Sequence, residues 1–346
     1  MGIGGMLGWL AMGSHRDQNL SPLRGRFDFR LIDPRLTPLR QAQGRQWAAC
    51  LRRYAAGASS GLVFFSFLAA AIPAQAARWT VRAEPVRLVN GAPVLFQVKA
   101  GVPLDSLAGT WLGHQLTFSY HASTKTWFAL GGVSIETAPG EYTLELTGKS
   151  ATGAGPLTFS QAFSVAKAKY PQIKAALTVE KKFTEPTPEQ QQQIAEGVKI
   201  KQDYLNRVTP DREWDGNFKA PADAAISDVF GSQRIFNGTA QSPHMGLDFR
   251  VPAGTPVAAM NDGTVLLARP LFYEGNFVVI DHGQGLLTLY LHLSEFKVKE
   301  GDVVKRGQII GLSGGTGRAT GPHLHVAVRW QGTYLDPARL VGMSLP

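Results

Sequence analysis

The chain has 346 residues, a formal net charge of +9, eight histidines and one cysteine. Its length suits two modest domains, and the lone Cys50 excludes an intramolecular disulfide and a cysteine-based zinc site. Residues 1–76 hold nine arginines and three aspartates, or +6 of the charge, so the rest is close to balanced and predicts no nucleic-acid partner.

An apolar run near the N-terminus predicts an export signal. Two arginines precede the apolar residues 61–72, and Ala74-Gln75-Ala76 fits the small-x-small cleavage pattern. The run is too short to span a bilayer stably. We therefore expect residues 1–76 to be a leader with its signal peptide at about 51–76, and no stable membrane span after cleavage. A signal anchor or buried helix is the alternative. Because signal peptides normally begin at the N-terminus, Leu51 is a candidate initiation site.

Residues 77–166 predict a small β domain. Pro139-Gly140-Glu141-Tyr142 resembles an entry into an immunoglobulin-like strand, so we expect an immunoglobulin-like β-sandwich. Trp111 and Trp127 are expected to pack in the core rather than line a sugar-binding face. Short apolar segments between turn residues give the expected strands, which lie in Val81–Val98 and at Leu116–Tyr120, Trp127–Leu130, Tyr142–Thr147 and Leu157–Val165.

Residues 167–225 predict a linker that contains one helix at about 188–208. Thr187 suits the N-cap, Pro188 suits the first helical position, and Gln190 completes a capping box. Such a helical arm can pack across the following domain and restrict its groove, which is our hypothesis for the linker.

Residues 226–346 predict a second domain that is nearly all β. Short apolar runs alternate with Gly, Asp and Asn, as is typical of strands joined by turns. The expected strands lie at 255–257, 264–267, 277–280, 286–291, 308–310 and 325–330.

Histidines and one aspartate in this second domain have the chemistry of a zinc site. His244 and Asp248 lie four residues apart, and His323 and His325 follow later in the chain. A catalytic zinc site uses three protein ligands, so His244, Asp248 and one of the two later histidines would supply them. In an extended segment His323 and His325 point into one groove, and the imidazole that is not a ligand is left to act on water or substrate.

His292 is a further candidate. It ends the strand-like run Leu289–Leu293. We expect Leu291 and Leu293 to face the core and His292 to face outward, as a second imidazole that is not a ligand.

Together these motifs resemble the lysostaphin-type (LytM-like) zinc endopeptidases, which cut peptide bonds in bacterial peptidoglycan. The likeness covers about residues 226–340 and rests on His244-x-x-x-Asp248, Tyr290-Leu-His292-Leu and Gly317–His325. Some members carry a tyrosine shortly before the first ligand histidine, whereas Phe236–Pro243 contains none.

The resemblance implies a mainly β chain whose C-terminal, antiparallel-β LytM-like metallopeptidase domain binds one Zn²⁺ in a groove bounded by loops. It also implies a role for each of five residues. The ligands would be His244, Asp248 and His325, and the catalytic pair would be His292 and His323.

The implied function is hydrolysis of peptidoglycan peptide cross-links by metal-activated water. The partners would be peptidoglycan peptide stems, and the sequence indicates no particular divisome or wall-hydrolase regulator. We expect an exported, periplasmic enzyme, because no wall-anchoring repeat is recognisable. The alternative is a catalytically inert LytM-like module that binds the wall and activates other hydrolases. Such a module would lack ligands, and all five residues are present here.

Overall fold

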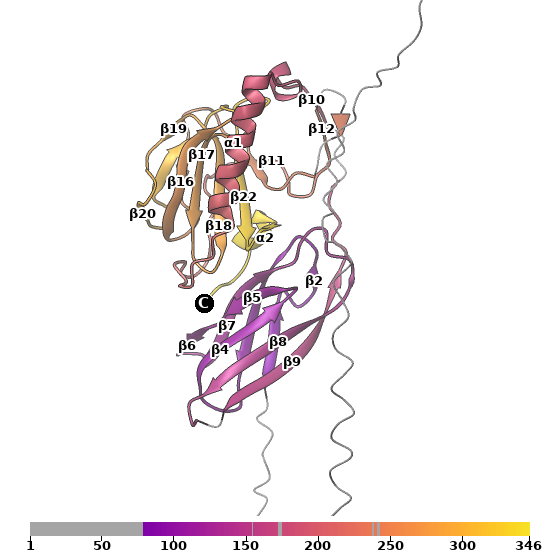
Figure 1. The fold of residues 1–346 in the computed structure, drawn as a ribbon, viewed down its shortest axis with the longest axis vertical. Helices are drawn as coiled ribbons and strands as arrows, with labels where there is room; N and C mark the ends of the chain where they lie inside the picture. The colour runs from indigo at the N-terminus through magenta and orange to yellow at the C-terminus, as the bar shows by residue number, and fades with distance from the viewer. Residues whose placement is uncertain (1–78, 154, 172–174, 237–238, 241–242) are drawn as a thin grey trace, which may run out of the picture. The chain divides into compact units, whose positions relative to one another are not determined.

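The structure is a computed structural model in which strands predominate, and every described residue belongs to the compact unit Ala71–Pro346. The leader and signal peptide expected within residues 1–76 lie outside the described residues. Among the helices that are described, none combines the length and the apolar character needed to cross a membrane. The described residues are 79–153, 155–171, 175–236, 239–240 and 243–346 (Figure 1).

Residues 80–166 form two sheets. The strands are β1 (Thr80–Glu84), β2 (Leu88–Val89), β3 (Pro93–Lys99), β4 (Leu104–Trp111), β5 (His114–Thr117), β6 (Ser119–His121), β7 (Thr126–Gly132), β8 (Gly140–Ser150) and β9 (Pro156–Ala166). One sheet has the order β1-β3-β7-β6 and the other β2-β9-β8-β4-β5. All neighbours are antiparallel except β2 and β9.

Aromatic side chains from both sheets meet in a shared core. Phe96 of β3 lies 5.1 Å from Trp111 of β4 and 5.5 Å from Phe163 of β9, measured between ring centroids. The indole N–H of Trp111 donates to the carbonyl oxygen of Gly132 at 3.0 Å, which satisfies its polar group. Trp111 and Trp127 are both buried, as core residues should be.

The strands of this region differ from the expected ones in two places. β4 (Leu104–Trp111) was not among the expected strands. Pairing with β8 and β5 on its two sides forms it, although Asp105, Ser106 and Gly109 have weak strand propensity. The single strand expected at Leu116–Tyr120 is divided. Its first part belongs to β5 and its last to β6, in different sheets, and the chain crosses between them at the buried Phe118.

Residues 167–225 contain the helix α1 (Pro188–Leu205), which ends three residues before the expected 208. The hydroxyl of Thr187 accepts from the N–H of Gln190 at 3.3 Å, and the side-chain oxygen of Gln190 accepts from the N–H of Thr187 at 2.9 Å. This reciprocal capping box satisfies two donors at the helix start. The short 3₁₀ helix η1 (Lys181–Phe183) precedes it, and β10 (Ala175–Leu177) joins β12 (Arg234–Phe236) and β13 (Thr239–Ala240) in a small sheet.

The remaining chain builds one large and one small sheet. The strands are β11 (Ile226–Asp228), β14 (Leu247–Phe249), β15 (Pro256–Ala258), β16 (Gly263–Leu271), β17 (Gly275–Asp281), β18 (Leu286–Leu293), β19 (Glu295–Phe296), β20 (Val303–Val304), β21 (Ile309–Leu312), β22 (Leu324–Trp330) and β23 (Thr333–Leu335). The large sheet has eight strands in the order β11-β14-β22-β18-β17-β16-β20, with β23 paired to β22. The small sheet β15-β21-β19 and helix α2 (Pro337–Val341) complete this part.

The two faces of the eight-stranded sheet have different covers. Tyr290 of β18 faces one hydrophobic core, whereas Leu289 of the same strand faces a second apolar cluster on the opposite side. Leu205 of α1 belongs to that second cluster, and Figure 1 shows α1 lying along the sheet. Because both faces are covered, β18 is an almost continuous apolar run. Helix α1 covers only part of its face, and the candidate site lies beside it.

Candidate metal and catalytic site

Strand pairing brings the candidate ligands together. In the antiparallel pair β14 and β22, Asp248 lies directly opposite His325. His244 precedes β14 and is held by its backbone, because its N–H donates to the carbonyl oxygen of Ser232 at 2.8 Å and its carbonyl oxygen accepts from the N–H of Gly231 at 2.7 Å. His244 and Asp248 from one segment thereby meet His325 from a segment far along the chain.

The ligand atoms of His244, Asp248 and His325 form a small triangle. Oδ1 of Asp248 lies 2.8 Å from Nδ1 of His325 and 3.2 Å from Nε2 of His244, and the two nitrogens are 3.0 Å apart. Ligands placed tetrahedrally around zinc at its usual bond lengths lie about 3.3 Å from one another. The donor set and its spacing therefore fit a zinc ion.

The Asp248 carboxylate is held in its ionised form. Burial alone would raise its pKa, but the contacts with the rings of His244 and His325 outweigh burial, so its pKa lies well below the usual range. The group is therefore available as an anionic ligand.

Backbone carbonyls orient the rings of three histidines. Nδ1 of His244 lies 3.0 Å from the carbonyl oxygen of Val229, Nδ1 of His292 lies 2.8 Å from that of Thr316, and Nδ1 of His323 lies 2.8 Å from that of Gly321. A carbonyl can only accept, so each ring donates from Nδ1 and keeps the lone pair of Nε2 in its neutral form. For His244 this nitrogen belongs to the ligand triangle.

His292 and His323 lie together beside the triangle. Their ring centroids are 4.9 Å apart, and the ring of His292 lies 6.1 Å from that of His325. Nε2 of His323 is 3.9 Å from Oδ1 of Asp248. All five residues singled out from the sequence thus meet in one place.

The expected orientation around His292 was partly wrong. Leu293 is buried in the core, as expected. Leu291, however, lines a cavity beside the ligand triangle, and His292 is only 7% exposed rather than facing outward. The register of β17 and β18 shifts between Asn276 and Val278, which gives β18 one extra residue, and His292 has φ +63°. This bulge breaks the alternation of the strand, so Leu291 and His292 both reach the cavity.

Burial, helped by the neighbouring His325 and His323, lowers the pKa of His292 to about 3 against the opposing effects of the Thr316 carbonyl and Asp248. Loss of hydration disfavours the charged ring. His292 is therefore neutral, which is the form that can accept a proton.

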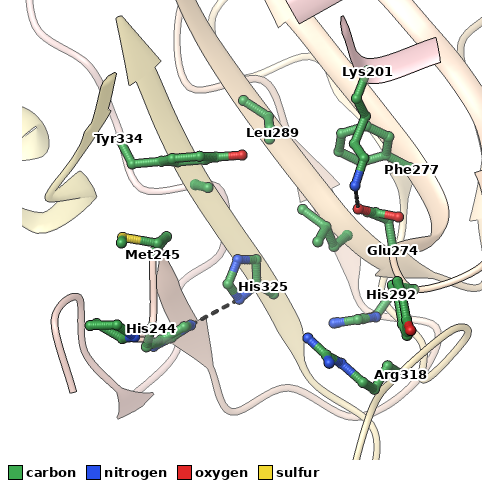
Figure 2. Close-up of a pocket in the computed structure, with 14 residues that line it drawn as sticks. Lys201, His244, Met245, Glu274, Phe277, Leu289, His292, Arg318, His325 and Tyr334 are labelled. Carbon is green, nitrogen blue, oxygen red and sulfur yellow. Dashed lines mark hydrogen bonds and ion pairs between the residues drawn. The ribbon is translucent and has the colours of Figure 1, made fainter. Parts of the chain in front are cut away.

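A cavity of about 370 Å³ is lined by three of the five residues, His244, His292 and His325. Figure 2 shows His244 and Met245 on one side, His325 in the middle, and His292, Arg318 and Glu274 on the other. Its apolar floor comes from residues of the sheet, namely Phe277, Leu289, Leu291 and Ala327. The remaining lining includes Lys201, Pro243, Tyr273 and Tyr334.

Sequence reasoning missed several residues of this site. Lys201 of α1, Glu274 and Tyr334 line the cavity, and the carboxylate of Asp228 lies 3.4 Å from Nδ1 of His244. Glu274 and Lys201 carry no motif, and their charges resemble ordinary surface charges in the sequence. Arg318 lies within a motif named above, but only the structure places it over the ring of Tyr273, at 4.8 Å.

Comparisons with known proteins match the same region. The sequence profile of Peptidase family M23 matches residues 242–337. The peptidoglycan DD-endopeptidase ShyA of Vibrio cholerae is 54% identical over 101 residues, 29% of this chain and 24% of ShyA. The DD-carboxypeptidase/endopeptidase Mpg of Neisseria meningitidis is 45% identical over 103 residues, 30% of this chain and 23% of Mpg. The chain thus matches about a quarter of the length of these relatives.

A solved structure extends the likeness beyond the site. It comes from Pseudomonas aeruginosa and is assigned to peptidase M23. The two chains are 30% identical and superpose with a TM-score of 0.58. The match covers 74% of this chain and 96% of the solved one.

Proposed function

The chain belongs to peptidase family M23, and on this basis we propose that it is a zinc-dependent endopeptidase that hydrolyses peptide cross-links of bacterial peptidoglycan. The observation that carries the proposal is the ligand triangle of His244, Asp248 and His325 beside the paired rings of His292 and His323. The name of ShyA gives the substrate class, and that of Mpg gives the same kind of activity, an endopeptidase. Because the match covers only about a quarter of each relative, that substrate is part of the proposal.

We assign His244, Asp248 and His325 as the ligands of one zinc ion. When bound, zinc supplies Lewis acidity, which polarises the scissile carbonyl and lowers the pKa of water towards neutrality. Support comes from the fit of the triangle to zinc and from the anionic state of Asp248. The backbone contact of His244 through Nδ1 adds to this, since an imidazole ligand commonly donates its other N–H to a carbonyl.

We assign His292 and His323 as the catalytic pair. Each ring donates from Nδ1 to a backbone carbonyl, so its Nε2 is available to accept a proton from the attacking water. The ring that accepts this proton returns it to the leaving amine as the C–N bond breaks.

The rest of the chain fits an exported enzyme. We propose a leader over residues 1–76, an immunoglobulin-like domain at 77–166, a linker at 167–225 and the peptidase domain at 226–346, with a periplasmic location. The two sheets that share the core of Trp111 support the second assignment. The wall substrate of the relatives supports export.

The competing function is an inert module that binds the wall and activates other hydrolases. It predicts a defective ligand set or a missing proton carrier. The compact triangle and the adjacent pair of imidazoles favour the enzyme.

The test is hydrolysis of purified cross-linked muropeptides by the zinc-loaded protein. We expect conversion to monomers with release of amino groups and no new reducing sugar, because amide hydrolysis leaves the glycan intact. A chelator should abolish the reaction and added zinc should restore it. Binding of peptidoglycan without any cleavage would replace this proposal with the inert module.

Variants separate ligands from catalytic residues in the same assay. His244→Ala, Asp248→Ala and His325→Ala should lose zinc, because two protein ligands hold the ion much more weakly than three. His292→Ala should retain about one zinc per chain yet lose hydrolysis. Metal content is measured by elemental analysis. Loss of zinc from His292→Ala together with its retention in His325→Ala contradicts the assignment.

A further inference from the structure

Helix α1 supplies a charged wall to the site although it lies outside the segment that the family profile matches. Nζ of Lys201 is 2.5 Å from Oε1 of Glu274, and the two side chains are only 29% and 14% exposed. Figure 2 shows this pair on the side of the cavity where His292 lies, away from His244. An ion pair shielded from solvent in this way restrains its partners more than an exposed pair does.

The backbone of Glu274 contacts His292. The carbonyl oxygen of Glu274 accepts from the N–H of His292 at 2.9 Å. His292 has φ +63°, a conformation that residues other than glycine keep only where their surroundings impose it. Two contacts impose it here, the Glu274 carbonyl on the backbone and the Thr316 carbonyl on the ring.

Glu274 lies in a turn with little freedom to relax around a change. The next residue, Gly275, has φ +66°, and a side chain there would collide with Thr316. Thr316 also accepts from the N–H of Asn276 at 2.9 Å. A shift of Glu274 is therefore passed to both contacts that orient His292.

Lys201 is a firm anchor for this turn, because the end of α1 is fastened to β22. Arg329 of β22 donates to the carbonyl oxygen of Leu205 at 2.7 Å and to the side chain of Asn206 at 3.0 Å. Leu205 is also buried against the sheet. Lys201 thus connects a helix held by β22 to the turn that contacts His292.

We infer that Lys201 is a positioning residue for His292 and acts through Glu274. The inference rests on the proposed hydrolytic function. Removing the ammonium group frees the Glu274 carboxylate, loosens the turn at 272–275 and lets the ring of His292 leave its place beside His323. The ligand triangle does not depend on the pair, so zinc remains bound.

The test is Lys201→Met, which keeps most of the side chain and removes its charge. For hydrolysis of a cross-linked muropeptide we expect kcat to fall on the order of tenfold, because small misplacements of catalytic groups lower the rate strongly. KM should change by less than about twofold, since substrate binding is not the property lost. Zinc content should be unchanged, and hydrogen exchange should accelerate at His292 and in the turn.

Matched variants test whether Lys201 acts on His292 through Glu274. Lys199 on the same helix forms an exposed ion pair with Asp203 at 2.6 Å, so Lys199→Met should leave kcat and hydrogen exchange unchanged. Lys201→Arg retains a cation and should keep most of the activity. Lys201→Glu and Glu274→Lys should each lower kcat, and the two together should restore much of it. Glu274→Gln lowers kcat without touching the helix, which provides an independent variant if Lys201→Met folds poorly.

The outcomes separate this inference from the proposed function. Wild-type kcat and wild-type hydrogen exchange in Lys201→Met overturn the positioning role. Failure of the wild-type protein to cleave overturns the proposed function instead. In that case hydrogen exchange at His292 in the zinc-loaded variants still tests whether Lys201 holds this residue in place.

Discussion

His244, His292 and His323 share one hydrogen-bond pattern. Each donates from Nδ1 to a backbone carbonyl, so the main chain determines which nitrogen is available. A carbonyl does not titrate, and the orientation it imposes does not change with pH. The three rings are therefore set by the loops that carry Val229, Thr316 and Gly321.

Gly246, between the two proposed ligands His244 and Asp248, has a steric role. A Cβ on this residue would lie 2.5 Å from Nε2 of His325 and 2.6 Å from the carbonyl oxygen of Val326. The backbone oxygen cannot move away easily, and the ring cannot shift without leaving Asp248. Only glycine allows this close approach.

We therefore predict that Gly246→Ala weakens zinc binding by on the order of tenfold, the lower end of the loss seen when support of a metal ligand is removed. Competition with a chelator measures the affinity. Gly140→Ala is the matched control, because a Cβ there meets only Tyr142, at 3.8 Å. Equal zinc affinity in the two variants would show that His325 adapts to the added methyl group.

Strand β18 carries the feature that places His292. A regular strand would direct Leu291 and His292 to opposite faces. The extra residue opposite β17 turns both towards the cavity. Bulges next to active sites commonly redirect one side chain in this way, and the contacts of Glu274 and Thr316 hold this one.

Helix α1 depends on its N-terminal cap. Thr187→Ala removes the side-chain acceptor for the N–H of Gln190, so we predict a loss of about 1 kcal/mol in the free energy of unfolding, the usual value for a lost N-cap. Urea unfolding measures it, and hydrogen exchange should accelerate in the first turn of α1. Thr187→Ser keeps the hydroxyl and should resemble the wild type. The prediction is wrong if Thr187→Ser destabilises as much as Thr187→Ala.

The stability of the whole molecule includes a contribution from a histidine remote from the ligand triangle. His282 is fully buried in the turn between β17 and β18. Its Nδ1 donates to the carbonyl oxygen of Asp262 at 2.6 Å, and its Nε2 lies 2.8 Å from the hydroxyl of Thr288. Burial lowers its pKa from 6.5 to about 4, although the Asp262 carbonyl acts in the opposite direction.

The lowered pKa of His282 makes the folded chain more stable at neutral pH than at acidic pH. Above pH 6.5 the ring is neutral in both the folded and the unfolded chain, and its contribution to stability is complete. As the pH falls from 6.5 to about 4, the unfolded chain binds a proton that the folded chain excludes. About 3 kcal/mol of stability is lost over that interval, at 1.36 kcal/mol per pKa unit.

We predict that His282→Gln has a shallower pH dependence of unfolding free energy over this interval. Its stability at neutral pH should be lower, because glutamine cannot reproduce both ring contacts. Urea unfolding with a chelator present isolates the effect from protonation of the ligand histidines. If the unfolding free energy of the variant and of the wild type falls with pH in parallel, the prediction for His282 is wrong.

Local patterns in the sequence predicted the features that depend on near neighbours. The β-branched and aromatic residues within 325–330 predicted β22, and its pairing with β14 brings His325 opposite Asp248. Thr187 and Gln190 predicted the start of α1, because a capping box involves residues only three apart. In both cases the information lies within one short segment.

Tertiary structure decided what depends on contacts between distant segments. Strand β4 forms because β8 and β5 supply its hydrogen bonds on both sides, despite its weak propensity. The bulge at His292 arises from the register between β17 and β18. Lys201 meets Glu274 from a helix whose end is held against the sheet by Arg329 and Leu205. Such contacts join residues far apart in the chain, and no local periodicity records them. The sequence therefore predicts the candidate ligands and most of the strands. Packing determines the orientation of His292 and the position of the Lys201–Glu274 pair beside it.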